Sequence, residues 1–220
     1  MLRFFQNQNK HTLLKICGVT SINDAENLAK YGVDALGFNF WPNSKRYITP
    51  QNASIISTAI KGKIIRVGVF VNAEHADILE LFKDDIIDIA QLHGDEDVNY
   101  CHAFAKSGLP FIKAIRVKNA NSLENLTNYK AQAILLDAHA PIDYGGTGDS
   151  FDWDLAEAAV SEHPDLPIFL AGGINLHNAS LATEQVKPYA LDIASGAELS
   201  PGIKDFDKIA AIQHAIRIPH

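Results

Sequence analysis

Residues 13–40 read LLKICGVTSINDAENLAKYGVDALGFNF and hold two short apolar runs on either side of a polar, helix-length segment. The runs Leu13–Cys17 and Ala35–Phe40 are apolar without strict alternation, which is typical of parallel strands buried on both faces. Between them, Ser21 supplies a helix N-cap and Gly32 a stop signal. The stretch therefore predicts one strand–helix–strand unit of a parallel sheet.

The same alternation continues along the rest of the chain. Helix starts recur after the apolar runs, for instance at Thr49-Pro50 and at Asn121-Ser122. Eight such units favour an α/β fold, a single parallel, eight-stranded (β/α)8 TIM barrel. A doubly wound open sheet is the alternative, but no G-x-G-x-x-G follows the first run. The expected strands are Leu13–Cys17, Ala35–Phe40, Ile64–Val71, Ile86–Leu92, Phe111–Val117, Ala133–Asp137, Pro167–Ala171 and Leu191–Ala194.

Composition narrows the class of protein. Hydrophobic residues make up 47% of the 220 residues and charged residues 20%, which excludes intrinsic disorder and coiled coils. The net charge of −7 argues against nucleic acid and anionic membranes as partners. No apolar run is long enough to span a bilayer, and Met1–His11 lacks the apolar core of a signal peptide. With only Cys17 and Cys101, we expect a reduced, cytoplasmic protein.

Functional side chains of such a barrel gather at the carboxyl ends of its strands. Cys17 ends the first run, and its thiolate could act as a nucleophile or general base, or the residue could be an inert part of the core. Asp137 closes the sixth run, where a carboxylate is costly unless it is solvated or functional. It could also be a cap or an ion-pair partner. An acid and a base across one barrel mouth suit a proton-shuttling isomerase.

Two glycine-containing loops follow the seventh and eighth runs. Gly172-Gly173 precedes one helix start, and Ser195-Gly196 follows the last run. Glycines there let backbone N–H groups point at an anion, and barrels of this kind bind phosphate at these two loops. If the glycines do not simply make tight turns, the pair predicts a phosphorylated small-molecule ligand.

Three further polar residues at strand ends are candidates for substrate binding. Arg46 could bind a carboxylate in a bidentate manner or be a solvated surface charge. His93 could stack on a ligand, donate a hydrogen bond or be a structural histidine. Asp192 could accept hydrogen bonds from substrate hydroxyls or hold the register of the last strand.

The loop after the sixth run is rich in glycine. Tyr144–Gly148, with Gly145 and Gly146 at its centre, is expected to be a flexible lid over the substrate, the alternative being a long ordinary turn. The nine histidines are scattered without an H-x-x-x-H or Cys/His cluster, so the sequence predicts no metal site.

Taken in order, these strand ends resemble those of the phosphoribosylanthranilate isomerases. The match runs from about Leu13 to Ile216. Its motifs are Lys15-Ile16-Cys17-Gly18, Ser44-Lys45-Arg46-Tyr47-Ile48, Gln91-Leu92-His93-Gly94, Leu135-Leu136-Asp137, Gly145-Gly146-Thr147-Gly148, Ala171-Gly172-Gly173-Ile174 and Ser195-Gly196-Ala197-Glu198.

The resemblance implies the Amadori rearrangement of N-(5′-phosphoribosyl)anthranilate to 1-(2-carboxyphenylamino)-1-deoxy-D-ribulose 5-phosphate in tryptophan biosynthesis. It implies Cys17 as general base, Asp137 as general acid and Arg46 as the contact to the anthranilate carboxylate. It implies no metal or organic cofactor, and either a monomer or a homodimer. Residues 1–11 lie outside the match and are expected to be a frayed N-terminal extension of a catalytic barrel domain over residues 12–220.

Three competing functions fit the sequence less well. The related isomerase of histidine biosynthesis has aspartate at the position of Cys17. Indole-glycerol-phosphate synthase would require an additional N-terminal helix. A phosphate sensor without catalytic activity would have no need for both Cys17 and Asp137.

Overall fold

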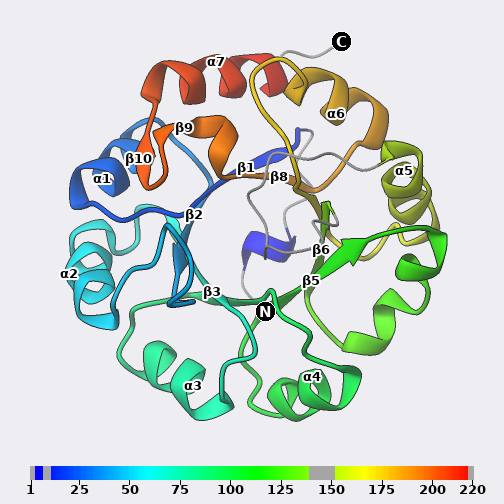
Figure 1. The fold of residues 1–220 in the computed structure, drawn as a ribbon, viewed down its shortest axis with the longest axis horizontal. Helices are drawn as coiled ribbons and strands as arrows, with labels where there is room; N and C mark the ends of the chain where they lie inside the picture. Colours follow the sequence, from blue (N-terminus) through cyan, green and yellow to red (C-terminus); the bar gives the residue numbers. More distant parts are fainter. Residues whose placement is uncertain (1–2, 7–10, 139–151, 218–220) are drawn as a thin grey trace.

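Eight parallel strands close into a barrel in this computed structural model, which describes residues 3–6, 11–138 and 152–217. The strands follow one another in chain order, and the last pairs with the first, which confirms the predicted α/β barrel. Figure 1 shows the ring of strands with the helices around it. The strands are β1 (Leu13–Cys17), β2 (Ala35–Asn39), β3 (Ile65–Phe70), β4 (Ile89–Leu92), β5 (Phe111–Val117), β6 (Ala133–Ala138), β7 (Ile168–Leu170) and β8 (Ala190–Ile193).

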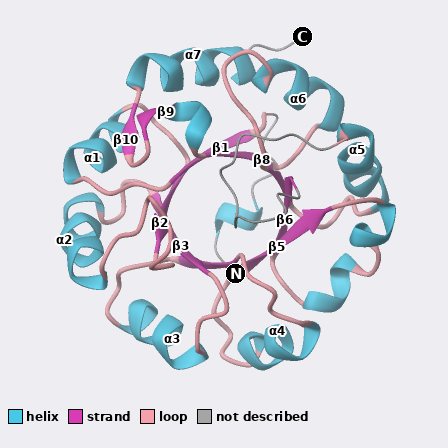
Figure 2. Ribbon diagram, viewed as in Figure 1, coloured by secondary structure: helices cyan, strands magenta, loops and turns pink. Residues whose placement is uncertain are grey.

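The helices form the outer layer, as Figure 2 shows. Several begin at capping side chains: the Ser21 hydroxyl accepts from the Asp24 N–H, and Thr49 accepts from the Asn52 N–H. No helix in the described part of the chain is long and apolar enough to cross a membrane. The helices are α1 (Ile22–Lys30), α2 (Pro50–Ile60), α3 (His75–Lys83), α4 (Val98–Ala105), α5 (Trp153–Glu162), α6 (Ala179–Val186) and α7 (Phe206–Arg217).

The segment between β5 and β6 differs from the expected α-helix at Asn121-Ser122. Two short 3-10 helices stand there, η2 (Ala120–Leu123) and η3 (Leu126–Tyr129). Asn125 and Lys130 adopt left-handed backbone conformations with φ of 61° and 56°, which interrupt any longer helix. The short polar side chains of this segment favour turns and caps over helix interiors.

A short hairpin follows the last barrel strand and was not foreseen from the sequence. After the 3-10 helix η4 (Ser195–Ala197), β9 (Glu198–Ser200) pairs antiparallel with β10 (Ile203–Lys204). The hairpin leads into α7 and brings two charged side chains, Glu198 and Lys204, to the end of β1.

The apolar core has two layers. The larger cluster lies between the strands and the helices, and the smaller one fills the barrel interior with side chains such as Leu13, Val67, Ile112 and Phe169. Filling of the interior by alternate strand residues makes the barrel a packed core and not a pore.

Within the expected frayed N-terminal extension, the described residues Arg3–Gln6 are ordered against the barrel. Arg3–Gln6 form a 3-10 helix, η1, which lies within the ring of strands in Figure 1. Phe5 is 8% exposed and belongs to the inner cluster, while the Phe4 ring packs on Phe169 and Tyr189. The Tyr189 hydroxyl also donates to the Phe4 carbonyl. Because Tyr189 directly precedes β8, η1 covers the amino-terminal end of the barrel, where two aromatic rings gain more from burial than from remaining in water.

The burial of Phe5 leads to a stability prediction. Phe5→Ala should lower the free energy of unfolding by about 2–3 kcal/mol, because the inner cluster loses the buried Phe5 ring. Urea denaturation measures the change, with Ile55→Ala as the control because Ile55 is 63% exposed. Equal effects of the two substitutions would contradict the packing of η1 against the barrel.

Candidate active site

One cavity opens at the carboxyl ends of the strands. Most of the residues singled out in the sequence line it: Cys17, Arg46, His93, Asp137, Gly172, Gly173, Asp192 and Ser195. Gly196 is not among its lining residues, and Gly145 and Gly146 lie outside the described residues. The lining residues to which the sequence analysis gave no role are Asn39, Ser44, Val69, Gln91, Ala171, Ile174 and Ala194.

Cys17 shares the inner face of β1 with a buried lysine. Lys15 is 0% exposed, and its Nζ lies 2.6 Å from Oδ2 of Asp192 on β8. Gly37 on β2 makes room for both side chains, since a Cβ there would stand 2.8 Å from Cys17 Sγ and 3.3 Å from Lys15 Nζ. Burial raises the pKa of the Cys17 thiol above its usual range, and the Lys15 ammonium acts in the opposite direction.

Asp137 belongs to a chain of three buried side chains. The Gln91 side-chain nitrogen lies 2.8 Å from His93 Nδ1, and His93 Nε2 lies 3.0 Å from Asp137 Oδ2. With the amide N–H of Gln91 donating to Nδ1, a neutral His93 carries its proton on Nε2 and donates it to Asp137. Gln91 lies in β4 and His93 directly follows it, so the alternation of side chains places both on one face. The extended backbone thus aligns the side chains of Gln91 and His93 toward Asp137.

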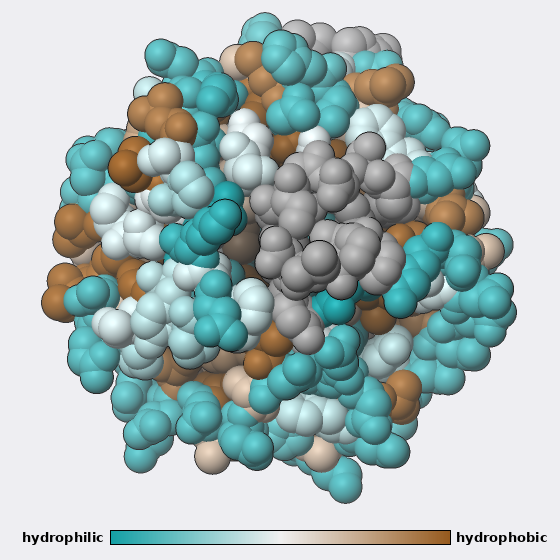
Figure 3. Space-filling view, viewed as in Figure 1, coloured by the Kyte–Doolittle hydropathy of each residue, from teal (hydrophilic) through white to brown (hydrophobic). Residues whose placement is uncertain are grey.

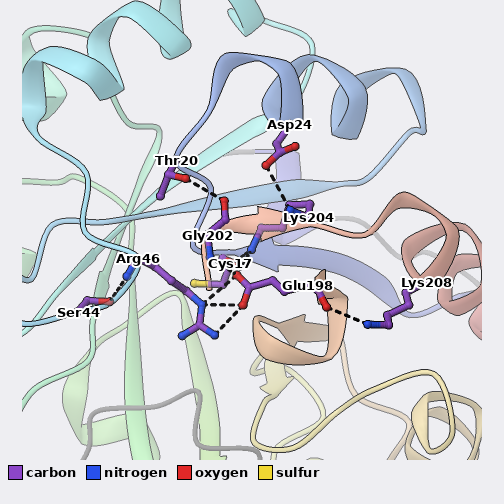
Figure 4. A network of polar contacts seen from close by, with 9 residues as sticks. All are labelled: Cys17, Thr20, Asp24, Ser44, Arg46, Glu198, Gly202, Lys204 and Lys208. Carbon is purple, nitrogen blue, oxygen red and sulfur yellow. Dashed lines mark hydrogen bonds and ion pairs between the residues drawn. The ribbon is translucent and has the colours of Figure 1, made fainter. Parts of the chain in front are cut away.

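Arg46 is held by the carboxylate of Glu198, for which the sequence predicted no role. Its Nε and Nη2 donate to the two oxygens of Glu198 at 2.9 and 2.7 Å (Figure 4). Among the described residues Arg46 Nη1 has no acceptor, so this nitrogen is available to a ligand in the cavity. Gly18 allows the Arg46 side chain to pack directly against the backbone, because a Cβ at Gly18 would collide with Arg46 Cδ.

Lys204 on β10 completes this network. Its Nζ donates to Glu198 at 2.7 Å and to the Cys17 carbonyl at 2.6 Å (Figure 4). Burial favours a raised pKa for the Glu198 carboxyl, but Arg46 and Lys204 hold that pKa below its usual range. The β9–β10 hairpin therefore links the end of β1 to Arg46: Lys204 binds the Cys17 carbonyl, and the buried, ionised Glu198 carboxylate binds both Lys204 and Arg46.

The loops after β7 and β8 lie close together. Gly172 and Gly173 have φ of 82° and 69°, a conformation that favours glycine, and a Cβ at Gly196 would collide with the Ile174 carbonyl oxygen. Within the described part of the chain, the N–H groups of Gly172 and Gly173 donate to no protein acceptor. Free N–H groups beside a cavity form a suitable site for an anion.

The described residues hold no group of three or more His, Cys, Asp or Glu side chains arranged to bind a metal ion. The face drawn in Figure 3 is mostly hydrophilic, with apolar side chains scattered in small groups.

Comparisons with known proteins identify the family of the chain. The family model of N-(5′-phosphoribosyl)anthranilate (PRA) isomerase matches residues 14–215. The N-(5′-phosphoribosyl)anthranilate isomerase of Citrifermentans bemidjiense is 44% identical over 199 residues, which cover 90% of this chain and 93% of the relative.

Solved structures give the same result. The phosphoribosyl anthranilate isomerase of Thermotoga maritima superposes with a TM-score of 0.84 and 37% identity over 94% of this chain and 98% of its own. Another solved phosphoribosyl anthranilate isomerase, in complex with reduced 1-(o-carboxyphenylamino)-1-deoxyribulose 5-phosphate, has a TM-score of 0.79 and 37% identity over 93% and 98% of the two chains. The chain belongs to the N-(5′-phosphoribosyl)anthranilate isomerase family.

Proposed function

We propose that this protein converts N-(5′-phosphoribosyl)anthranilate to 1-(2-carboxyphenylamino)-1-deoxy-D-ribulose 5-phosphate, a step of tryptophan biosynthesis. The observation that carries the proposal is the presence of a thiol and a carboxyl group, Cys17 and Asp137, around one cavity that is also lined by Gly172 and Gly173. Membership of the isomerase family supports the same reaction.

Ring opening needs an acid, and Asp137 is the group that we assign to it. Asp137 gives its proton to the ring oxygen of the ribose as the bond from that oxygen to C1′ breaks. The lone pair of the anthranilate nitrogen forms the C1′=N double bond of a Schiff base. The resulting Asp137 carboxylate accepts the hydrogen bond from His93 Nε2, so His93 stabilises the acid after it has lost its proton.

Enolisation needs a base, and Cys17 is the group that we assign to it. The Cys17 thiolate removes the proton from C2′, and the electrons of that bond form the C1′=C2′ double bond. The electrons of the C1′=N bond return to nitrogen. The enol then tautomerises to the ketose product.

The remaining lining residues are assigned to substrate binding. Arg46 offers Nη1 to the anthranilate carboxylate, and the loops at Gly172-Gly173 and Ser195-Gly196 bind the phosphate. Asp192 Oδ1 is buried and has no hydrogen-bond partner among the described residues, so it is suited to accept from a ribose hydroxyl. Gly145 and Gly146 remain candidates for covering the substrate.

Loss of either assigned proton-transfer group should abolish turnover. Cys17→Ser and Asp137→Asn are each expected to reduce kcat/KM by at least about 10²-fold, measured as the loss of phosphoribosylanthranilate fluorescence. Cys101→Ala is the matched control for the thiol, since Cys101 is buried in α4 outside the cavity. Turnover that survives Cys17→Ser would exclude Cys17 as the base. No turnover by the folded wild type would contradict the proposed reaction itself.

The role assigned to Arg46 predicts an effect mainly on KM. Arg46→Met should raise KM by about ten- to a hundredfold, because one charge-assisted contact to the carboxylate is worth about 1.5–3 kcal/mol. Its effect on kcat should be much smaller. Steady-state kinetics separate the two parameters, with Arg46→Lys as the charge-preserving comparison. A loss confined to kcat would place Arg46 away from the carboxylate.

A further inference from the structure

We propose that Lys15 is the positioning residue for Cys17: its ammonium group, anchored on Asp192, orients the sulfur and stabilises the thiolate. The proposal deepens the proposed function, on which it rests, by naming the group that makes Cys17 a base. It is carried by the burial of Lys15, by its incomplete set of acceptors and by the space that it shares with Cys17.

The burial of Lys15 requires an explanation. A lysine that is 0% exposed within a barrel strand loses its hydration, and an ion pair with Asp192 compensates for that loss only in part. An apolar side chain would satisfy the packing at lower cost. A buried charge in the middle of β1, two residues before Cys17 and on the same face, points to a use for the charge itself.

The hydrogen bonds of Lys15 leave it able to donate toward Cys17. Of the three N–H groups of an ammonium, one donates to Asp192 at 2.6 Å. Lys113 on β5, also buried beside a carboxylate, instead donates to the carbonyls of Leu92 and Gly94 and to Glu96. Lys113 is thus fully occupied by acceptors of the protein, whereas Lys15 has no acceptor besides Asp192 among the described protein oxygens and retains donors beside the thiol.

Gly37 shows how close the two groups are. A single Cβ added at Gly37 would contact both Cys17 Sγ, at 2.8 Å, and Lys15 Nζ, at 3.3 Å. Sulfur and ammonium therefore border one space about the size of a methyl group. In agreement, a hydrogen bond and the positive charge of Lys15 both act to lower the pKa of Cys17 against the effect of burial.

Four charged groups surround Cys17, from β1, β8, β10 and the loop after β2. Burial is the largest influence and raises the pKa of Cys17, Lys15 and Lys204 lower it, and Asp192 raises it. Arg46 is paired with Glu198, which, against the effect of burial and with a smaller contribution from Cys17, raises the pKa of its guanidinium. Lys204 is bound to Glu198 and to the Cys17 carbonyl, and Lys15 is the cation whose Nζ shares with Cys17 Sγ the space beside Gly37.

Alkylation of Cys17 tests this inference without any substrate. In a Cys101→Ala background, the rate of reaction with iodoacetamide is measured against pH for the wild-type residue and for Lys15→Met. Removal of the positive charge disfavours the thiolate, so the midpoint should move to higher pH by at least about one unit. The rate at pH 7 should then fall at least about tenfold. An unchanged midpoint in the folded variant would overturn the proposal.

Matched variants separate charge from packing. Lys15→Arg keeps the charge and should restore at least about half of the shift, whereas Lys113→Met, which removes a buried lysine elsewhere, should leave the midpoint of Cys17 unchanged. If Lys15→Met does not fold because Asp192 is left unpaired, Lys15→Met/Asp192→Asn carries the test. Its midpoint should still rise, because the ammonium that is lost borders Cys17 Sγ, whereas the carboxylate that is lost is bound to that ammonium.

Turnover gives the second readout. Lys15→Met should lower kcat/KM for phosphoribosylanthranilate at least about tenfold, in step with the alkylation rate. If the alkylation midpoint shifts and neither protein turns over this substrate, Lys15 still activates Cys17 and only the proposed reaction fails. If turnover is normal in the wild type and Lys15→Met leaves both readouts unchanged, the reaction stands and the role of Lys15 fails.

Discussion

The pairing of β1 with β8 is the constraint on which the barrel and its candidate site depend. It closes the sheet, and its register sets Leu13 opposite Ala190 and Lys15 opposite Asp192. Closure therefore brings together two charges that lie 177 residues apart in the chain. The same register places Cys17 at the end of β1, directly above this ion pair, so the position of the thiol follows from the closure of the fold.

Buried charge recurs around this end of the barrel. Lys15 pairs with Asp192, Lys113 with Glu96, and Lys204 with Glu198, each at 2.6–2.7 Å. Such pairs are weak sources of stability because both partners lose their hydration. These pairs lie toward the carboxyl ends of the strands, whereas the aromatic rings of η1 close the opposite end of the barrel. Such a division fits a barrel that is stabilised at one end and functional at the other.

The sequence was sufficient to predict the strands and the cavity but not the partners within it. Apolar runs bounded by caps predicted the barrel, and the rule that strand ends carry function led to Cys17 and Asp137. The Asn-rich segment after β5 was wrongly predicted as a helix because local turn preferences prevailed over the repeat. The pairing of Arg46 with Glu198 spans 152 residues and depends on where the β9–β10 hairpin places Glu198, so no local sequence pattern predicts it.

The proposed roles of Cys17 and Asp137 require an unusual distribution of protons. A free thiol has a pKa of about 8.5 and a free aspartate about 3.9, so at neutral pH the proton belongs on the thiol. Catalysis needs it on Asp137. The form with a thiol and a carboxylate and the form with a thiolate and a carboxylic acid hold the same number of protons. Their ratio therefore depends on the difference between the two pKa values and does not change with pH. An ammonium beside Cys17 acts on that difference, which is why a fixed positive charge at Lys15 favours the productive form where a change of pH would not.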